Sequence, residues 1–261
     1  MENFESKNLG FSAMKELIRK ATAPLTKSLR EVHELMLPMF KRLSELPDQE
    51  KTLLSHLAER GWFLPLDFLL GLPVSGLDSL TQSTKCKSDA EIDRSIVEFY
   101  TKRLDEVLNS LIMVFSERKH LFQSAFKAHK RKEYDLSIPV LLASADGVCL
   151  DMLGVKLYSK RNGVPVTKDA LDDKIRCLAV DKIVDVFFEP LRSGSAFSFS
   201  ENEMKKRRAS DRNYMVLNRH EILHGSDVAY GNEVNSLKAI SQLEYLACVK
   251  KFLEHREKSV A

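Results

Sequence analysis

The sequence has no closely spaced cysteines. Its four cysteines, Cys86, Cys149, Cys177 and Cys248, lie far apart, and no two of them form a Cys-x-x-Cys pair. The spacing therefore indicates neither a disulfide framework nor a cysteine zinc site. We expect a protein of a reducing compartment.

The sequence also has no segment typical of a signal peptide or a membrane anchor. Residues 1–5 include two acidic side chains and no apolar core, and the apolar stretch from Trp62 to Val74 is interrupted by Asp67 and two prolines. We therefore expect a cytoplasmic protein that does not use a membrane.

An excess of charge of one sign is missing as well. The 261 residues include 40 Lys and Arg against 37 Asp and Glu, a net charge of only +3. Binding to nucleic acid would therefore have to use local clusters of basic residues. The hydrophobic content of 44% is ample for a buried core.

No segment alternates with the period of two that is typical of a strand, so the sequence predicts an all-α protein. Apolar residues at helical spacing predict two or three helices within residues 10–60. Further helices are expected over residues 88–115, 134–153, 169–191 and 235–254. The prolines and glycines of residues 61–76 predict a buried loop, with Trp62 in the core.

A polar stretch at residues 80–88 is a candidate domain boundary. We predict an N-terminal helical region of unknown role, residues 1–85, followed by a helical bundle, residues 86–261.

Two stretches of the bundle are rich in basic residues and are candidates for binding RNA phosphates. A charge run is often only a solvated helix face, but the second stretch, residues 201–219, leads directly into a group of histidines, which favours a functional role. The candidates are Lys130 and Arg131 in the first stretch and Lys205, Lys206, Arg207, Arg208 and Arg212 in the second.

The histidines belong to residues 218–225, which fit two chemistries. Arg219 and His224 form an Arg-x4-His pair, suited to phosphodiester cleavage without a metal: the His exchanges a proton and the Arg holds negative charge. His220, Glu221 and His224 instead form His-Glu-x-x-His, a zinc motif in which the Glu is the general base. Glu244 lies where a third zinc ligand would be expected.

The sequence around the motif favours the metal-free chemistry. Gly225 ends the helix directly after the second histidine, and no predicted strand precedes the motif to hold an extended peptide substrate. On an ideal helix, however, Arg219 and His224 project about 140° apart. They can meet if the helix end unwinds at Gly225 or if a second subunit completes the site.

The C-terminal part of the chain resembles the HEPN ribonuclease superfamily, in particular a group of uncharacterised bacterial HEPN-like proteins. The likeness rests on residues 134–139 with residues 145–147, on Asn218 to Gly225, and on Tyr230-Gly231 with residues 235–239, and it covers about residues 117–255 with a core at about 133–255.

The resemblance implies a HEPN-like bundle that cleaves RNA through its 2′-hydroxyl without a cofactor, often as a toxin or phage-defence effector. It implies a composite site in a homodimer and a possible antitoxin or regulatory partner. His224 would be the general acid or base, Arg219 would stabilise the transition state, and His220 would orient the site. Asn218, Asp146 and Tyr230 would support it.

Two alternatives stay open. One is a non-catalytic HEPN-like module that binds RNA or protein. The other is a zinc peptidase using His220, His224 and Glu244. The metal-free mechanism gives Glu221 no role, so it predicts that a substitution there is tolerated.

Overall fold

The described part of the protein is mostly helical, as predicted. The computed structural model describes residues 51–65, 89–176, 182–210, 214 and 216–260, which all belong to one compact unit, Pro47–Ala261. The elements in chain order are α2 (Lys51–Glu59), α5 (Asp89–Val114), η1 (Ser116–Arg118), α6 (Lys119–Lys130), α7 (Tyr134–Leu153), β1 (Lys160–Arg161), β2 (Val164–Pro165), α8 (Val166–Arg176), α9 (Lys182–Phe187), α10 (Glu189–Ser193), η2 (Ala196–Ser198), α11 (Glu201–Ser210), α12 (Arg219–Leu223) and α13 (Glu233–Val260).

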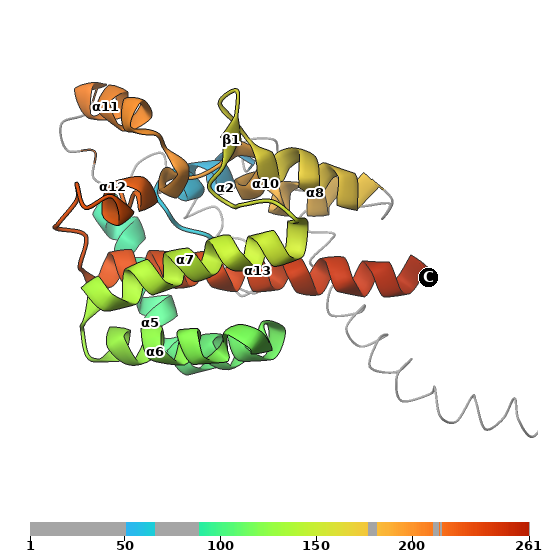
Figure 1. Cartoon of the computed structure of the whole chain (residues 1–261), viewed down its shortest axis with the longest axis horizontal. Coiled ribbons are helices and arrows are strands. Elements are labelled where there is room, and N and C mark those ends of the chain that lie inside the picture. The colour runs from blue at the N-terminus through green and yellow to red at the C-terminus, as the bar shows by residue number, and fades with distance from the viewer. Residues whose placement is uncertain (1–50, 66–88, 177–181, 211–213, 215, 261) are drawn as a thin grey trace, which may run out of the picture. The chain divides into compact units, whose positions relative to one another are not determined.

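Four long helices form the centre of the unit. α7 packs against both α13 and α6, and α5 closes the ring by packing against α13 and α6 (Figure 1). Apolar side chains at helical spacing explain this packing, because they place one stripe of each helix in the core. On α5 the buried stripe consists of Ile92, Ile96, Tyr100, Val107 and Leu111.

α7 is the most apolar helix. It is long and apolar enough to cross a membrane, but 56% of its apolar window is buried inside the protein, mainly by α6 and α13. Burial of this kind is also found in the core helix of a globular bundle, so its composition alone does not indicate a membrane span.

A second group of short elements packs beside this ring. α10 contacts α2 and α8, and α8 contacts α7. Residues 61–65 form the predicted buried loop, and Trp62 lies in the core as predicted, 1% exposed. Its indole Nε1 donates a hydrogen bond to Asp93 at 2.6 Å, which ties the loop to α5.

A two-stranded antiparallel hairpin departs from the all-helical prediction. β1 and β2 pair around Asn162 and Gly163, which both have positive φ angles, 53° and 80°. An Asn-Gly pair suits this tight turn, because both residues tolerate a left-handed backbone. Strands of two residues are too short to give an alternating pattern.

The segment predicted as a single helix, residues 169–191, is helical where the structure describes it, but it is interrupted at Phe188. α8 is described up to Arg176 and α9 from Lys182 to Phe187, and α10 begins at Glu189, with Pro190 in its first turn. Proline is favoured at the start of a helix, so Pro190 begins a new helix here and does not end a long one. By contrast, the predictions for residues 88–115, 134–153 and 235–254 are confirmed by α5, α7 and α13.

Three predictions lie wholly or partly outside the described residues. These are the helices expected before Lys51, the part of the predicted buried loop after Pro65, and the domain boundary expected at residues 80–88. Within the described residues, Phe63 contacts both α5 and α13: its carbonyl accepts a hydrogen bond from Tyr100 and its backbone N–H donates to Ser241.

A buried polar network joins three helices of the ring. His129 Nδ1 of α6 lies 2.8 Å from Ser236 Oγ of α13, and Ser236 Oγ lies 2.9 Å from Ser137 Oγ of α7. Burial, with a smaller effect of the Lys130 charge, lowers the pKa of His129 to about 4. The imidazole is therefore neutral in the folded protein at neutral pH.

This network predicts a specific loss of stability in acid. An unfolded histidine takes up a proton near about pH 6.5, whereas folded His129 does so only near pH 4, so stability falls as the pH drops through this window. From about pH 7 to about pH 5, His129 should lower the free energy of unfolding by about 2 kcal/mol, measured by urea unfolding.

The test compares how the free energy of unfolding changes with pH in the wild type and in two variants. His129→Asn should lose this part of the slope, while His120→Asn, an exposed histidine on the same helix, should keep it. Equal slopes for the wild type and His129→Asn would contradict the assignment.

Candidate functional site

The short helix α12 carries the histidine motif, and a buried asparagine holds its start. Asn218 Oδ1 accepts a hydrogen bond from the backbone N–H of Glu221 at 3.0 Å and so caps the helix. Its Nδ2 donates to the carbonyls of Ala196 and Phe199, at 3.1 and 3.0 Å. Asn218, predicted as a supporting residue, therefore anchors α12 to η2.

Gly225 ends the helix, as the sequence predicts. Its φ is 75°, its N–H donates to the carbonyl of Ile222, and the N–H of Ser226 donates to the carbonyl of Glu221. This is the Schellman pattern, in which a left-handed residue after the helix closes the last turn. The motif thus occupies little more than one turn, fixed at both ends.

The structure brings the two histidines together. The ring centroids of His220 and His224 are 4.3 Å apart with an angle of 57° between the ring planes, and both side chains are exposed. Their i, i+4 spacing places them on one side of the turn. The motif therefore presents two imidazoles side by side.

Arg219 points to a different neighbour. Its guanidinium carbon lies 5.5 Å from the centroid of the Tyr158 ring, and the Tyr158 hydroxyl donates a hydrogen bond to Gln242 Oε1 of α13 at 2.5 Å. Burial, and next the charge of Asp146, raise the pKa of Tyr158 well above its ordinary value. Tyr158 is therefore a neutral phenol, and its ring packs below the arginine.

Asp146 lies beside the same tyrosine. Asp146 is expected as a supporting residue of the site, and its buried Oδ1 accepts no hydrogen bond from the part of the chain that the structure describes. Its charge, after burial itself, also contributes to raising the pKa of Cys149 to about 12. A carboxylate with a buried, unsatisfied oxygen near Tyr158 adds negative charge on the α7 side of Arg219.

Glu221 has a structural role that the sequence does not reveal. It is only 8% exposed, and Arg208 of α11 holds both of its carboxylate oxygens at 2.8 Å. A substitution of Glu221 should therefore reduce stability whatever the chemistry of the motif, contrary to the tolerance expected from sequence.

The alternative zinc ligands are not gathered into one site. Glu244 of α13 lies beside other groups: one of its oxygens is 3.4 Å from Arg103, and its charge, after burial itself, contributes to raising the pKa of the buried Tyr100. No three His, Cys, Asp or Glu side chains in the described ranges are placed to hold a metal ion. Glu221, the base of the zinc mechanism, is occupied by Arg208.

Most of the predicted RNA-binding residues form ion pairs with acids. RNA phosphates would have to compete with these partners, which weakens the simple picture of a free basic surface. The pairs are Lys130 with Asp105, Arg131 with Glu133, Lys205 with Glu201, Arg207 with Glu59, and Arg208 with Glu221.

The two other predicted basic residues differ from these. Lys206 is exposed and makes no ion pair with the described residues, while Arg212 lies outside them. In Figure 1, α6 and α11 lie on opposite sides of the α7 and α13 layer, so the two basic stretches do not form one continuous surface.

Tyr230 holds the loop after the motif. Pro139 lies inside α7 and has no N–H to bond the carbonyl of Asp135 one turn earlier. The Tyr230 hydroxyl donates to that carbonyl at 3.2 Å. Tyr230, predicted as a supporting residue, therefore attaches the loop to α7.

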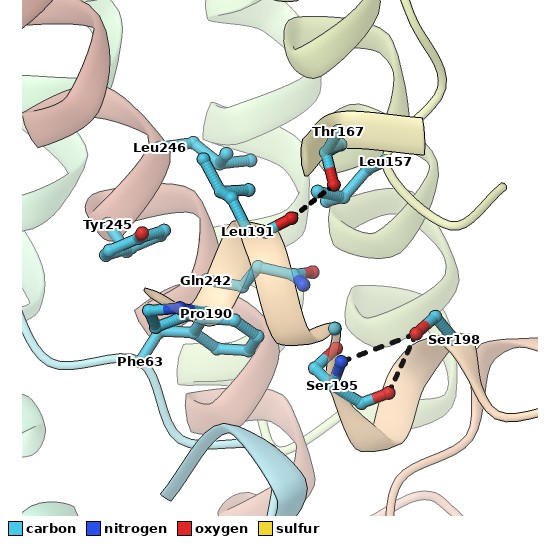
Figure 2. A pocket seen from close by; sticks show the side chains of 11 residues that line it. Phe63, Leu157, Thr167, Pro190, Leu191, Ser195, Ser198, Gln242, Tyr245 and Leu246 are labelled. Carbon is cyan, nitrogen blue, oxygen red and sulfur yellow. Dashed lines mark hydrogen bonds between the residues drawn. The ribbon is translucent and has the colours of Figure 1, made fainter. Parts of the chain in front are cut away.

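One enclosed pocket among the described residues is a gap in the core. It lies between α10, η2 and α13, with Phe63, Gln242 and Tyr245 among its lining residues, and Figure 2 shows the hydrogen bond from Thr167 to the Leu191 carbonyl beside it. Its free space, about 10 Å³, is enough for about one water molecule. A substrate does not fit there.

Comparison with known proteins adds no family. No family model, no curated protein and no solved structure matches the chain.

The pair of Glu221 and Arg208 gives a prediction on stability. Glu221→Ala removes the carboxylate that Arg208 holds and leaves the guanidinium without this partner. The free energy of unfolding should therefore fall by about 1–3 kcal/mol. Denaturant unfolding of Glu221→Ala, Arg208→Ala and the double variant should give a coupling energy of about 1 kcal/mol.

Glu201→Ala is the matched control. It removes the carboxylate of an exposed pair with Lys205 and should change stability by less than about 0.5 kcal/mol. Additive effects of the Glu221 and Arg208 substitutions would contradict the role assigned to their contact.

Proposed function

We propose that the protein is a metal-independent endoribonuclease with His220 and His224 as its proton-transfer groups. The single observation that carries this proposal is the exposed imidazole pair, 4.3 Å between ring centroids, on a turn fixed at both ends. Imidazole is the side chain best suited to both accept and donate protons near neutral pH.

The proposed reaction uses a nucleophile that RNA itself carries. One imidazole accepts the proton of a 2′-hydroxyl as its oxygen attacks the adjacent phosphorus. The bond from phosphorus to the 5′-oxygen breaks, and the other imidazole donates a proton to that oxygen. The products are a 2′,3′-cyclic phosphate and a 5′-hydroxyl, and no water or metal takes part in this step.

Arg219 would stabilise the negative charge that develops on the phosphorane oxygens. Its planar guanidinium suits two phosphate oxygens at once. In its own chain it lies over Tyr158, so we propose that the full site forms in a homodimer, where residues of two copies face one substrate. This corresponds to a HEPN-like bundle used as a toxin or phage-defence effector, with an antitoxin or regulatory partner as its control.

Exposed apolar side chains near the motif support a second copy as the partner. Leu223 ends α12, Val228 follows in the loop that Tyr230 attaches to α7, and Leu136 lies next to the Asp135 carbonyl that holds this loop. Large apolar side chains clustered on a surface are typical of interfaces.

The second candidate function is a HEPN-like module that binds RNA without cleaving it. It is favoured by Lys206, which is exposed and makes no ion pair with the described residues, so it can contact a phosphate without any catalytic step. The zinc peptidase has less support, because Arg208 occupies Glu221 and Glu244 pairs elsewhere.

The ribonuclease proposal predicts cleavage of single-stranded RNA in the presence of EDTA. His220→Ala and His224→Ala should each lower the rate by about 10²–10⁴-fold, and Arg219→Ala by about 10²–10³-fold. The measurement is product formation from an end-labelled oligonucleotide, with identification of the cyclic phosphate. An oligonucleotide with 2′-deoxyribose at every position should stay intact.

His120→Ala is the control, since it removes an exposed histidine of α6 away from the motif. Cleavage that persists unchanged in His224→Ala would overturn the mechanism. RNA binding without cleavage by the wild type would favour the binding module. Hydrolysis of a peptide substrate that depends on added zinc would favour the peptidase alternative.

The homodimer gives a separate prediction. Val228 is 85% exposed, so Val228→Asp should leave the fold intact but disrupt an interface around the motif. Light scattering coupled to size exclusion should show a dimer for the wild type and a monomer for the variant.

Met113→Asp is the matched control, because Met113 is 77% exposed but lies on α5. It should remain dimeric. A wild type that is monomeric at all concentrations tested would contradict the composite site.

A further inference from the structure

An open hollow beside α11 has the features of a nucleotide subsite. Its volume is about 500 Å³, and it is lined by Glu203, Lys206, Arg207, Ser210 and Tyr214. The four residues from α11 recur at helical spacing, so one face of this helix forms one wall. The volume falls within the range of about 300–1,000 Å³ that is typical of small-ligand pockets.

Flat groups are stacked at this wall. The guanidinium carbon of Arg207 lies 4.2 Å from the ring centroid of Phe199 and 5.6 Å from that of Tyr214. The Tyr214 hydroxyl donates to the carbonyl of Glu59 at 3.3 Å, which holds the tyrosine ring in place. A base can stack on such a platform at little cost in side-chain ordering.

One cation that lines the hollow, Lys206, has no carboxylate partner among the described residues. Both oxygens of Glu203 bind Lys160, at 2.8 and 2.9 Å, and one of them also accepts from the backbone N–H of Ser200. Arg207 pairs with Glu59. Lys206 has no carboxylate partner among the residues that the structure describes, so its ammonium can bind a phosphate without first giving up an ion pair.

We propose that this hollow binds one unpaired nucleotide of an RNA strand, with the base against the Tyr214 and Arg207 platform and a phosphate on Lys206. The identity of the ligand as RNA rests on the proposed function. An aromatic ring beside a cation is how proteins hold single-stranded nucleic acid, whose bases are free to stack. α11 also supplies Arg208, which donates hydrogen bonds to the Glu221 carboxylate of α12. The subsite and the histidine turn are therefore connected through α11.

The test measures binding separately from cleavage. A fluorescent single-stranded RNA with 2′-O-methyl groups at every position has no nucleophile, and fluorescence anisotropy reports its affinity for the full chain. Lys206→Ala should weaken binding by about 3–10-fold and reduce the slope of log affinity against log salt by about 0.7, as expected for one lost phosphate contact.

Two other lysines provide the comparison. Lys168→Ala removes an exposed lysine of α8 and should bind like the wild type. Lys205→Ala removes the same charge one residue away, outside the hollow and paired with Glu201, and should cost less than Lys206→Ala. Equal losses in Lys205→Ala and Lys206→Ala would overturn the subsite, because they would indicate only a general electrostatic effect.

The tyrosine tests the stacking. Tyr214→Leu should weaken binding by roughly tenfold, whereas Tyr214→Phe, which keeps the ring and loses only the hydroxyl, should bind nearly as well as the wild type. If Tyr214→Leu does not fold, the comparison of the lysines still decides. Polyglutamate that displaces the RNA as effectively as unlabelled RNA does would overturn the RNA assignment in favour of an acidic peptide.

The result separates this inference from the proposed function. Binding that depends on Lys206 in a protein that cleaves no RNA would support the subsite and reject the nuclease. Cleavage by the wild type together with unchanged binding of Lys206→Ala would reject the subsite and leave the nuclease.

Discussion

The side-chain amide of Asn218 is the interaction on which the position of the motif depends. One end of this buried amide caps α12, and the other end holds two carbonyls at η2. A helix of five residues is too short to be stable by itself, since nucleation costs more than one turn of hydrogen bonds returns. The turn that presents His220 and His224 therefore exists because the body of the protein supplies its first hydrogen bond and Gly225 closes its last.

The long helices could be predicted from the sequence because their information is local. The repeated apolar stripes of α5 and α13 are sufficient to identify them. The start of α10 could not be predicted in this way: the amphipathic pattern continues across the interruption at Phe188, and Pro190 suits the end of one helix as well as the start of another.

The candidate site shows the same division between local and distant information. The i, i+4 spacing of His220 and His224 places them together on any helix, and the structure has them in contact. The neighbours of Arg219 and Glu221 come from distant parts of the chain. Tyr158 lies in the connection after α7 and Arg208 in α11, and no local pattern links either of them to the motif. The basic stretches are visible in the composition, but distant acidic partners, such as Asp105 for Lys130 and Glu59 for Arg207, are not.

The proline of α7 connects the core of the protein to its surface in an indirect way. Because Pro139 cannot donate a hydrogen bond, α7 keeps one carbonyl, that of Asp135, available to the Tyr230 hydroxyl. Gly231 follows directly, where a side chain would require the Asp135 carboxylate to move. A residue with an N–H at position 139 would donate a hydrogen bond to the Asp135 carbonyl and compete with the Tyr230 hydroxyl. This competition would weaken the attachment of the loop that leads from the histidines into α13. The attachment of this loop therefore depends on Pro139, which lies one turn of α7 after the residue whose carbonyl holds the loop.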